Sequence, residues 1–181
     1  MKLRVTSAGH YLHTVREGEP LPDLTPALKR VCRERPRRVD RFIELALLGS
    51  GQCVRGRELK PGCGIYLGSG FGPMASNLAV QEQMLRDREL PKPFDFMNIL
   101  GASAGFHVAK NLGLKGQNLF ISRRGASLEA ALTLAQADLM LGVVSQALVG
   151  VVEEATLPLA QHRQRQGVPA DTPVAEGSHW L

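Results

Sequence analysis

Short apolar segments that alternate with helix-like segments constrain the fold of this chain most strongly. Residues 64–68, 118–122 and 146–152 are apolar runs of strand length, bounded by glycine or polar residues. The segments between them show helical spacing of apolar residues, and helical crossovers are what parallel strands require. The sequence therefore predicts a layered α/β fold, a mixed sheet with helices packed on it.

Eight elements are expected, in the order strand, helix, strand, helix, helix, strand, helix, strand. Alternating polar and apolar residues predict an opening strand at 2–6, whereas 17–26 and 49–64 are expected to be loops. Helices are expected at 39–48, 75–85, 94–112 and 126–141. The polar, proline-containing residues 161–181 predict a C-terminal tail that is mobile or orders against a partner. The domain then comprises residues 1–160.

Composition bounds the class of protein. The chain has 181 residues, and with 44% hydrophobic and 22% charged residues it can bury a core. The most apolar stretch, 130–152, is interrupted by Asp138 and by uncharged polar residues, and no apolar run opens the chain. No membrane interaction, spanning helix or signal peptide is therefore predicted, and a cytoplasmic location is expected. Cys32, Cys53 and Cys63 lack C-x-x-C spacing, so no disulfide framework and no metal site are expected.

Gly68 ends the strand at 64–68, and Gly70 and Gly72 follow it before a helix begins, as in a nucleotide-binding loop. The dinucleotide fingerprint that starts with Gly68 and Gly70 needs its third glycine where Pro73 stands, and no Walker pattern is present. The alternative is that the glycines from Gly68 to Gly72 permit a tight turn, because glycine readily adopts positive φ angles. The sequence therefore predicts a tight turn here and no cofactor.

Positive charge is concentrated in one segment. The net charge is +5, and seven of the thirteen residues from Lys29 to Arg41 are Lys or Arg. Such a segment can bind an acidic protein, an acidic membrane or nucleic acid, or form a solvated helix edge. It contains no aromatic residue, so base stacking is not indicated. The residues expected to take part in binding are Lys29, Arg30, Arg33, Arg37, Arg38 and Arg41.

From Gly64 to Glu154 the chain resembles the N-terminal half of the β-ketoacyl synthases, members of the thiolase-like superfamily. The resemblance rests on four stretches in the family's order and spacing: the strand and glycine turn 64–72, the central helix and turn 94–116, the nucleophile loop 121–127, and the helix and strand 131–154. It implies a thiolase-like half-fold.

The resemblance places Gly125 at the position of the family's catalytic cysteine. In the family, that cysteine takes an acyl group from a carrier-protein thioester, and histidines of the C-terminal half promote decarboxylation of a malonyl thioester. Glycine has no side chain to acylate. None of the five histidines of this chain stands in the family's histidine contexts, and the length is that of one half. We therefore expect no condensation by this chain alone.

A ketosynthase fold without the cysteine resembles the chain-length-factor partners of type II polyketide synthases. This implies a non-catalytic subunit of fatty-acid or polyketide biosynthesis, with aryl-polyene pigments as the suggested context. It would pair with an active β-ketoacyl synthase or with itself, shape the acyl tunnel, and bind acyl carrier protein through the basic segment. The residues expected at the partner interface or tunnel are Phe94, Phe96, Met97, Ile99, Leu100, Phe106, Leu119, Phe120 and Ile121. For the first six of these residues, from Phe94 to Phe106 in the list, the alternative is that all six pack inside the chain.

Two other functions remain open at this point. An acyltransferase or thioesterase would use Ser127 or a cysteine as its nucleophile, although no base accompanies Ser127 in the sequence. A nucleic-acid-binding protein would use the basic segment, residues 29–41, and its affinity would fall steeply with added salt. The lack of aromatic residues in that segment disfavours this alternative.

Overall fold

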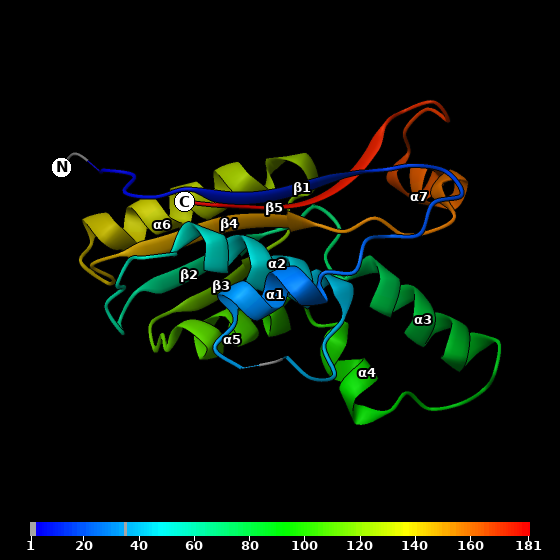
Figure 1. Cartoon of the computed structure of the whole chain (residues 1–181), viewed down its shortest axis with the longest axis horizontal. Coiled ribbons are helices and arrows are strands. Elements are labelled where there is room, and N and C mark those ends of the chain that lie inside the picture. Colours follow the sequence, from blue (N-terminus) through cyan, green and yellow to red (C-terminus); the bar gives the residue numbers. More distant parts are fainter. Residues whose placement is uncertain (1–2, 35) are drawn as a thin grey trace.

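A five-stranded mixed sheet forms the centre of the computed structural model, which describes residues 3–34 and 36–181 (Figure 1). The strand order is β1-β5-β4-β2-β3. The strands are β1 (Gly9–Val15), β2 (Gly64–Gly68), β3 (Asn118–Ile121), β4 (Ala147–Glu153) and β5 (Val174–Trp180). Strands β2, β3 and β4 are parallel, whereas β5 is antiparallel to both β1 and β4. The predicted α/β fold with a mixed sheet is confirmed.

Helices cover the two faces of the sheet unequally. The helices are α1 (Thr25–Val31), α2 (Arg41–Cys53), α3 (Met74–Leu85), α4 (Pro93–Asn98), α5 (Gly101–Leu112), α6 (Ser127–Met140) and α7 (Leu159–Gln166). Figure 1 shows α1, α2 and α5 on one face and α6 on the other, with α3, α4 and α7 at one end of the domain. Within the described residues, no helix is long and apolar enough to cross a membrane.

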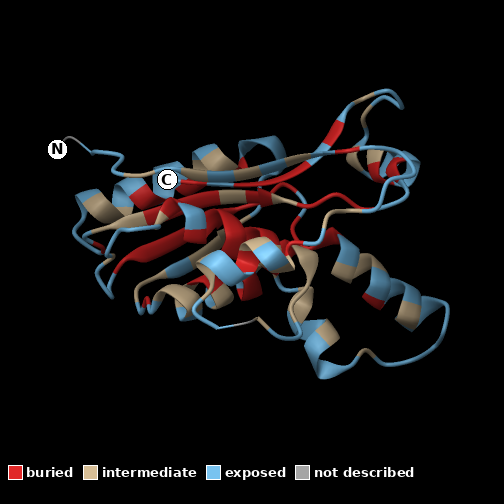
Figure 2. Cartoon of the chain, viewed as in Figure 1, coloured by how far each residue is buried: buried red, intermediate tan, exposed pale blue. Residues whose placement is uncertain are grey.

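The alternation of side chains along β2 produces the two core layers. Ile65 and Leu67 point toward α2 and α5 and join the larger core cluster, whereas Tyr66 points toward α6 and packs with Ala131 and Ala135. All five residues of β2 are buried (Figure 2), as expected for a central strand covered on both faces. The glycine-bounded apolar segment was therefore the most informative strand signal in the sequence.

Two expectations for the N-terminal region are wrong. Residues 3–8 have no regular structure, and β1 begins at Gly9, where a β-carbon would lie 2.2 Å from the backbone N of Cys53. Helix α2 continues to Cys53 instead of ending at Leu48. Gly49 and Gly51, which suggested a loop, lie inside the helix. Both positions require glycine because a side chain would overlap β5 at Gly49 and α1 at Gly51. Close packing outweighs the low helix propensity of glycine here.

The single helix predicted at 94–112 is two helices. Leu100 adopts an extended backbone conformation between α4 and α5, with φ −85° and ψ 113°. The hydroxyl group of Ser103 donates a 2.6 Å hydrogen bond to the carbonyl oxygen of Met97 across this break. The bond satisfies a carbonyl at the end of α4, and the helix direction changes at this point.

The predicted C-terminal tail is also wrong. Residues 161–181 contain most of α7 and all of β5, and β5 lies in the sheet between β1 and β4. Four alternate residues of β5 are buried, and two of them are polar: Val174, Glu176, Ser178 and Trp180. Because buried polar residues break the apolar alternation, the sequence pattern did not indicate a strand. These residues are part of the domain.

The buried side chain of His162 makes stability depend on pH. His162 is 1% exposed on α7; its Nδ1 accepts the Thr156 N–H at 3.2 Å, and its Nε2 lies 2.9 Å from the side-chain amide of Gln166. Burial lowers the pKa of His162, and Arg165 and Arg163 lower it further. An accepting Nδ1 requires the neutral ring.

We therefore expect the contribution of His162 to the free energy of unfolding to fall as the pH drops below about 6.5, the pKa of an unfolded histidine. The unfolded chain then binds the proton more readily, with a slope of at most about 1.4 kcal/mol per pH unit. Urea unfolding from pH 8 to pH 5 measures this contribution as the difference in slope between the unmodified protein and His162→Gln, because buried carboxyl groups such as Glu154, whose pKa burial raises to about 8, act in the opposite direction in both proteins. His162→Gln is expected to reduce the slope, and His10→Gln, on the exposed side of β1, is the control for replacing a histidine by glutamine. Equal slopes in all three proteins contradict the prediction.

Candidate functional site

The carboxyl ends of the parallel strands β2, β3 and β4 meet at one edge of the sheet, where loops commonly form sites. The turn 68–72 and the loop 122–127 lie at this edge. Glu153, the last residue of β4, accepts hydrogen bonds from the Gly70 N–H and, at 3.2 Å, from the Ser69 hydroxyl group. Burial raises the pKa of Glu153, and these hydrogen bonds oppose that shift. The carboxyl group thus holds the glycine turn in place.

Gly125 lies in the loop that joins β3 to α6. A single 3₁₀ turn, η1 (Arg124–Ala126), precedes the helix, and Arg124 has a φ of 50°. Gly125 is exposed, and a β-carbon built on it would meet no atom within 4 Å. The loop therefore has room for a side chain at this position, and the sequence supplies none.

The Ser127 hydroxyl group is not placed as a nucleophile. Ser127 is 1% exposed, and its Oγ lies 2.9 Å from the Ser69 carbonyl oxygen and 2.8 Å from that of Arg124. The same Oγ accepts the Arg123 N–H at 2.8 Å. All three partners are backbone groups, so no side chain of the described residues is placed to remove its proton. Ser127 joins the two loops and has a structural role.

The cysteine thiols are not activated either. Cys53 and Cys63 are buried, and Cys63 precedes β2, at the opposite end of the strand from the glycine turn. Burial raises the pKa of Cys63 to about 11 and also raises that of Cys32. A protonated thiol is a poor nucleophile. In residues 3–34 and 36–181, no group of three or more His, Cys, Asp or Glu side chains could hold a metal ion.

Five of the apolar residues expected at an interface are exposed on α4, on α5 and in the turn between them. This α4–α5 patch consists of Phe94, Phe96, Met97, Leu100 and Phe106, and its members are 43–57% exposed. The alternative that all of these residues pack inside the chain is wrong. Ile99 is half-buried.

The other three expected interface residues lie on β3 and are half-buried. Leu119 and Ile121 pack toward α6, and Phe120 packs edge-on against Phe42 with ring centroids 6.3 Å apart. Strand β3 pairs with β2 and is an edge of the sheet. Its outer backbone groups are therefore open to pairing with another strand.

The basic segment divides into exposed and structural residues. Lys29, Arg30, Arg33, Arg37 and Arg38 are exposed, and the Arg38 guanidinium lies 4.5 Å from the centre of the Phe94 ring. Arg35 lies outside the described residues. Arg41 does not fit the predicted binding role, because its guanidinium is engaged inside the domain. It donates two hydrogen bonds to the carboxylate of the fully buried Glu176 and one, at 2.7 Å, to the Pro22 carbonyl oxygen.

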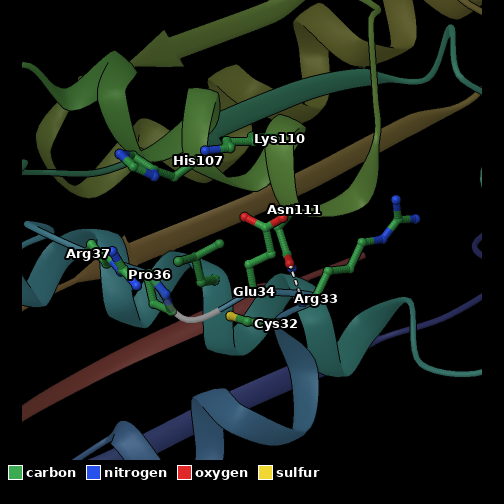
Figure 3. Close-up of a pocket in the computed structure, with 9 residues that line it drawn as sticks. Cys32, Arg33, Glu34, Pro36, Arg37, His107, Lys110 and Asn111 are labelled. Atoms are coloured by element: carbon green, nitrogen blue, oxygen red, sulfur yellow. Dashed lines mark hydrogen bonds between the residues drawn. The ribbon is translucent and has the colours of Figure 1, made fainter.

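A cavity of about 750 Å³, the α5 cavity, opens between α5 and the connection from α1 to α2 (Figure 3). Its lining residues are Cys32, Arg33, Glu34, Pro36, Arg37, Leu47, His107, Lys110 and Asn111. The sequence reasoning missed the contribution of α5. The available signal was the i, i+3, i+4 spacing of His107, Lys110 and Asn111, which places three polar side chains on one helix face.

The comparisons with known proteins agree with this fold. The family model described as "Beta-ketoacyl synthase, N-terminal domain" matches residues 8–173. No curated protein matches the chain. The solved structure of the ishigamide ketosynthase/chain length factor is similar with a TM-score of 0.69 and 21% sequence identity; the match covers 89% of this chain and 47% of that chain. This chain thus spans about half the length of that relative.

Two further structures are similar. A ketosynthase (ApeO) in complex with its chain length factor (ApeC) from Xenorhabdus doucetiae gives a TM-score of 0.64 at 17% identity, covering 98% of this chain and 78% of that chain. A type II PKS acyl-carrier protein in complex with its ketosynthase gives 0.62 at 17% identity, covering 77% and 42%. At these identities the similarity establishes the fold.

Proposed function

Because the chain belongs to the β-ketoacyl synthase N-terminal domain family, we propose that it is a non-catalytic ketosynthase-like subunit that pairs with an active β-ketoacyl synthase. Gly125 carries the proposal. It stands at the family's nucleophile position, in an exposed loop with free space, and it has no group to acylate. The neighbouring Ser127 hydroxyl group is engaged with the backbone, and the Cys63 thiol is protonated.

The α4–α5 patch supports a partner at this face of the domain. Exposed aromatic and aliphatic side chains gathered on adjoining elements are typical of protein interfaces. The edge strand β3 offers backbone groups to the same kind of partner. In the pair, bulky residues of the patch would close the end of the partner's acyl tunnel and limit the length of the growing chain. The pathway proposed is fatty-acid or polyketide biosynthesis, with aryl-polyene pigments as one such context.

The exposed cations of the basic segment support a second contact, with acyl carrier protein. Acidic partners are attracted by Lys29, Arg30, Arg33, Arg37 and Arg38, which lie on α1 and in the connection that follows it. Attraction between exposed charges steers association and weakens as salt is added. Similar structures include a ketosynthase with its chain length factor and an acyl-carrier protein with its ketosynthase.

We expect the protein to bind the β-ketoacyl synthase encoded nearest to it, and binding to depend on the α4–α5 patch. Replacing both Phe96 and Phe106 by Asp is expected to lower the affinity at least about 30-fold, because charged groups would be buried where aromatic anchors pack. Isothermal titration calorimetry with the purified synthase measures the change. Val5→Asp is the matched control, since Val5 is also exposed (64%) but lies in the N-terminal segment away from the patch.

A second measurement separates this function from an acyltransferase or thioesterase. Intact-mass spectrometry after incubation with acyl-CoA and acyl carrier protein thioesters is expected to show no adduct on the chain. An adduct that disappears in Ser127→Ala or Cys32→Ala would overturn the non-catalytic assignment. Failure to bind the synthase, or equal binding by the Asp double variant and Val5→Asp, would reject the proposed interface. Self-association in place of synthase binding would reject the heterodimer.

A further inference from the structure

Positive groups gather at one end of the α5 cavity. Arg37 from the α1–α2 connection and Lys110 from α5 contribute two cations, and the ring of His107 lies beside them (Figure 3). The Arg33 guanidinium is directed to the end of α5, where it donates to the Leu112 carbonyl oxygen at 3.3 Å. The Glu34 carboxylate, the one acidic group among the lining residues, lies toward Asn111 in Figure 3.

The ring of His107 adds a hydrogen-bond donor beside the two cations of the cavity lining. Burial lowers the pKa of His107, and the charge of Lys110 lowers it further. The ring is therefore neutral at pH 7 and can donate an N–H without adding charge. Arg37 from the connection and Lys110 with the neutral His107 donor from α5 match a dianion with three terminal oxygens better than they match a carboxylate with two.

Part of the cavity lining is apolar. Leu47 is 2% exposed on α2, and burial raises the pKa of the Cys32 thiol, which stays uncharged. A ligand whose anionic group lies between Arg37 and Lys110 would therefore place its remaining atoms over apolar surface. The volume of about 750 Å³ lies within the range of small-molecule sites.

We propose that the α5 cavity binds a phosphate monoester of a small apolar molecule, with the phosphate group between Arg37 and Lys110 and the apolar group over Cys32 and Leu47. A phosphate monoester carries close to two negative charges at neutral pH and three acceptor oxygens. This site is independent of the proposed pairing with a synthase. The cavity adjoins the α4–α5 patch. The ring of Phe106, in the patch, packs edge-on against the ring of His107, in the cavity lining, with ring centroids 5.5 Å apart.

Calorimetric titration of the whole chain with hexyl phosphate, inorganic phosphate and 1-hexanol tests the proposal. Hexyl phosphate is expected to bind most tightly, because it alone fills both parts of the cavity. Arg37→Gln and Lys110→Gln are each expected to weaken its binding at least about tenfold, the effect of losing one charge-assisted hydrogen bond. Both side chains are exposed, so the variants are expected to fold, and far-UV circular dichroism checks this.

Arg30→Gln is the matched control, since it removes the same charge from an exposed residue that does not line the cavity. It is expected to bind hexyl phosphate as the unmodified protein does. Equal weakening in Arg30→Gln and Arg37→Gln would assign binding to overall charge and overturn the site. Equal affinity for hexyl phosphate and 1-hexanol would overturn the phosphate subsite, and equal affinity for hexyl phosphate and inorganic phosphate would overturn the apolar one. Absence of hexyl phosphate binding at millimolar concentration would reject the proposal outright.

Discussion

Replacing Arg41 by Ala is expected to lower the free energy of unfolding by about 3–5 kcal/mol, the effect of leaving one charge of a buried ion pair without its partner. The Glu176 side chain has no exposed surface, and its two carboxylate oxygens accept from the Arg41 guanidinium. The pair joins the first turn of α2 to β5. In the variant, the Glu176 carboxylate must be buried alone or take up a proton. Urea unfolding followed by circular dichroism measures the loss.

Arg37→Ala is the control for this prediction. Arg37 belongs to the same basic segment but is exposed, so its loss is expected to change stability by no more than about 0.5 kcal/mol. The double variant Arg41→Met, Glu176→Leu is expected to lose less than Arg41→Ala, because no buried charge remains. Equal effects of Arg41→Ala and Arg37→Ala would show that Arg41 is a surface residue after all, as its position in the sequence suggested.

Replacing Trp180 by Ala is expected to destabilise the domain by about 3–5 kcal/mol, the usual cost of removing a large buried aromatic side chain. Trp180 is 1% exposed at the end of β5, and its indole N–H donates to the Ser178 hydroxyl group at 2.9 Å. A β-carbon on Gly150 would lie 2.2 Å from the ring, so the glycine and the indole fill one space. Removing the ring leaves a cavity between β4, β5 and α2.

Urea unfolding followed by far-UV circular dichroism measures this effect, because the variant lacks the only tryptophan of the chain. His179→Thr is the matched control: it changes the neighbouring, exposed residue of the same strand and is expected to alter stability by no more than about 0.5 kcal/mol. If Trp180→Ala were as stable as His179→Thr, β5 would not contribute to the core, and the description of residues 161–181 as a tail would be restored.

The elements that were predicted well are those whose apolar pattern is complete within one short stretch of sequence. Strand β2 is a glycine-bounded apolar run, and α6 has helical spacing from Ser127 onward, so both were found nearly to their ends. The elements that were missed depend on distant partners. Helix α2 contains two glycines because β5 and α1 pack closely against them. Glu176 of β5 can be buried because Arg41 reaches it, and the buried Ser178 accepts the indole N–H of Trp180.

The same distinction applies to the candidate site. The assignment of Gly125 to the family's nucleophile position stays a prediction from the sequence, since it rests on the spacing of the surrounding motif and on the fact that a glycine cannot be acylated. The engagement of the Ser127 hydroxyl group was not predictable, because its partner Ser69 is 58 residues away. The α5 cavity joins Arg37 to Lys110, which the chain brings together only through the packing of α2 and α5.

The sequence by itself therefore determined the α/β class and the order along the chain of the central strands and helices, and it placed a glycine, Gly125, in the loop between β3 and α6. Tertiary structure decided which cations are free and which apolar residues are exposed. Arg37 and Arg41 are chemically identical, yet one lines an open cavity and the other neutralises a buried carboxylate. The physical reason is that burial and pairing depend on the neighbours that the fold supplies, whereas residue type and spacing describe only what a segment can do alone.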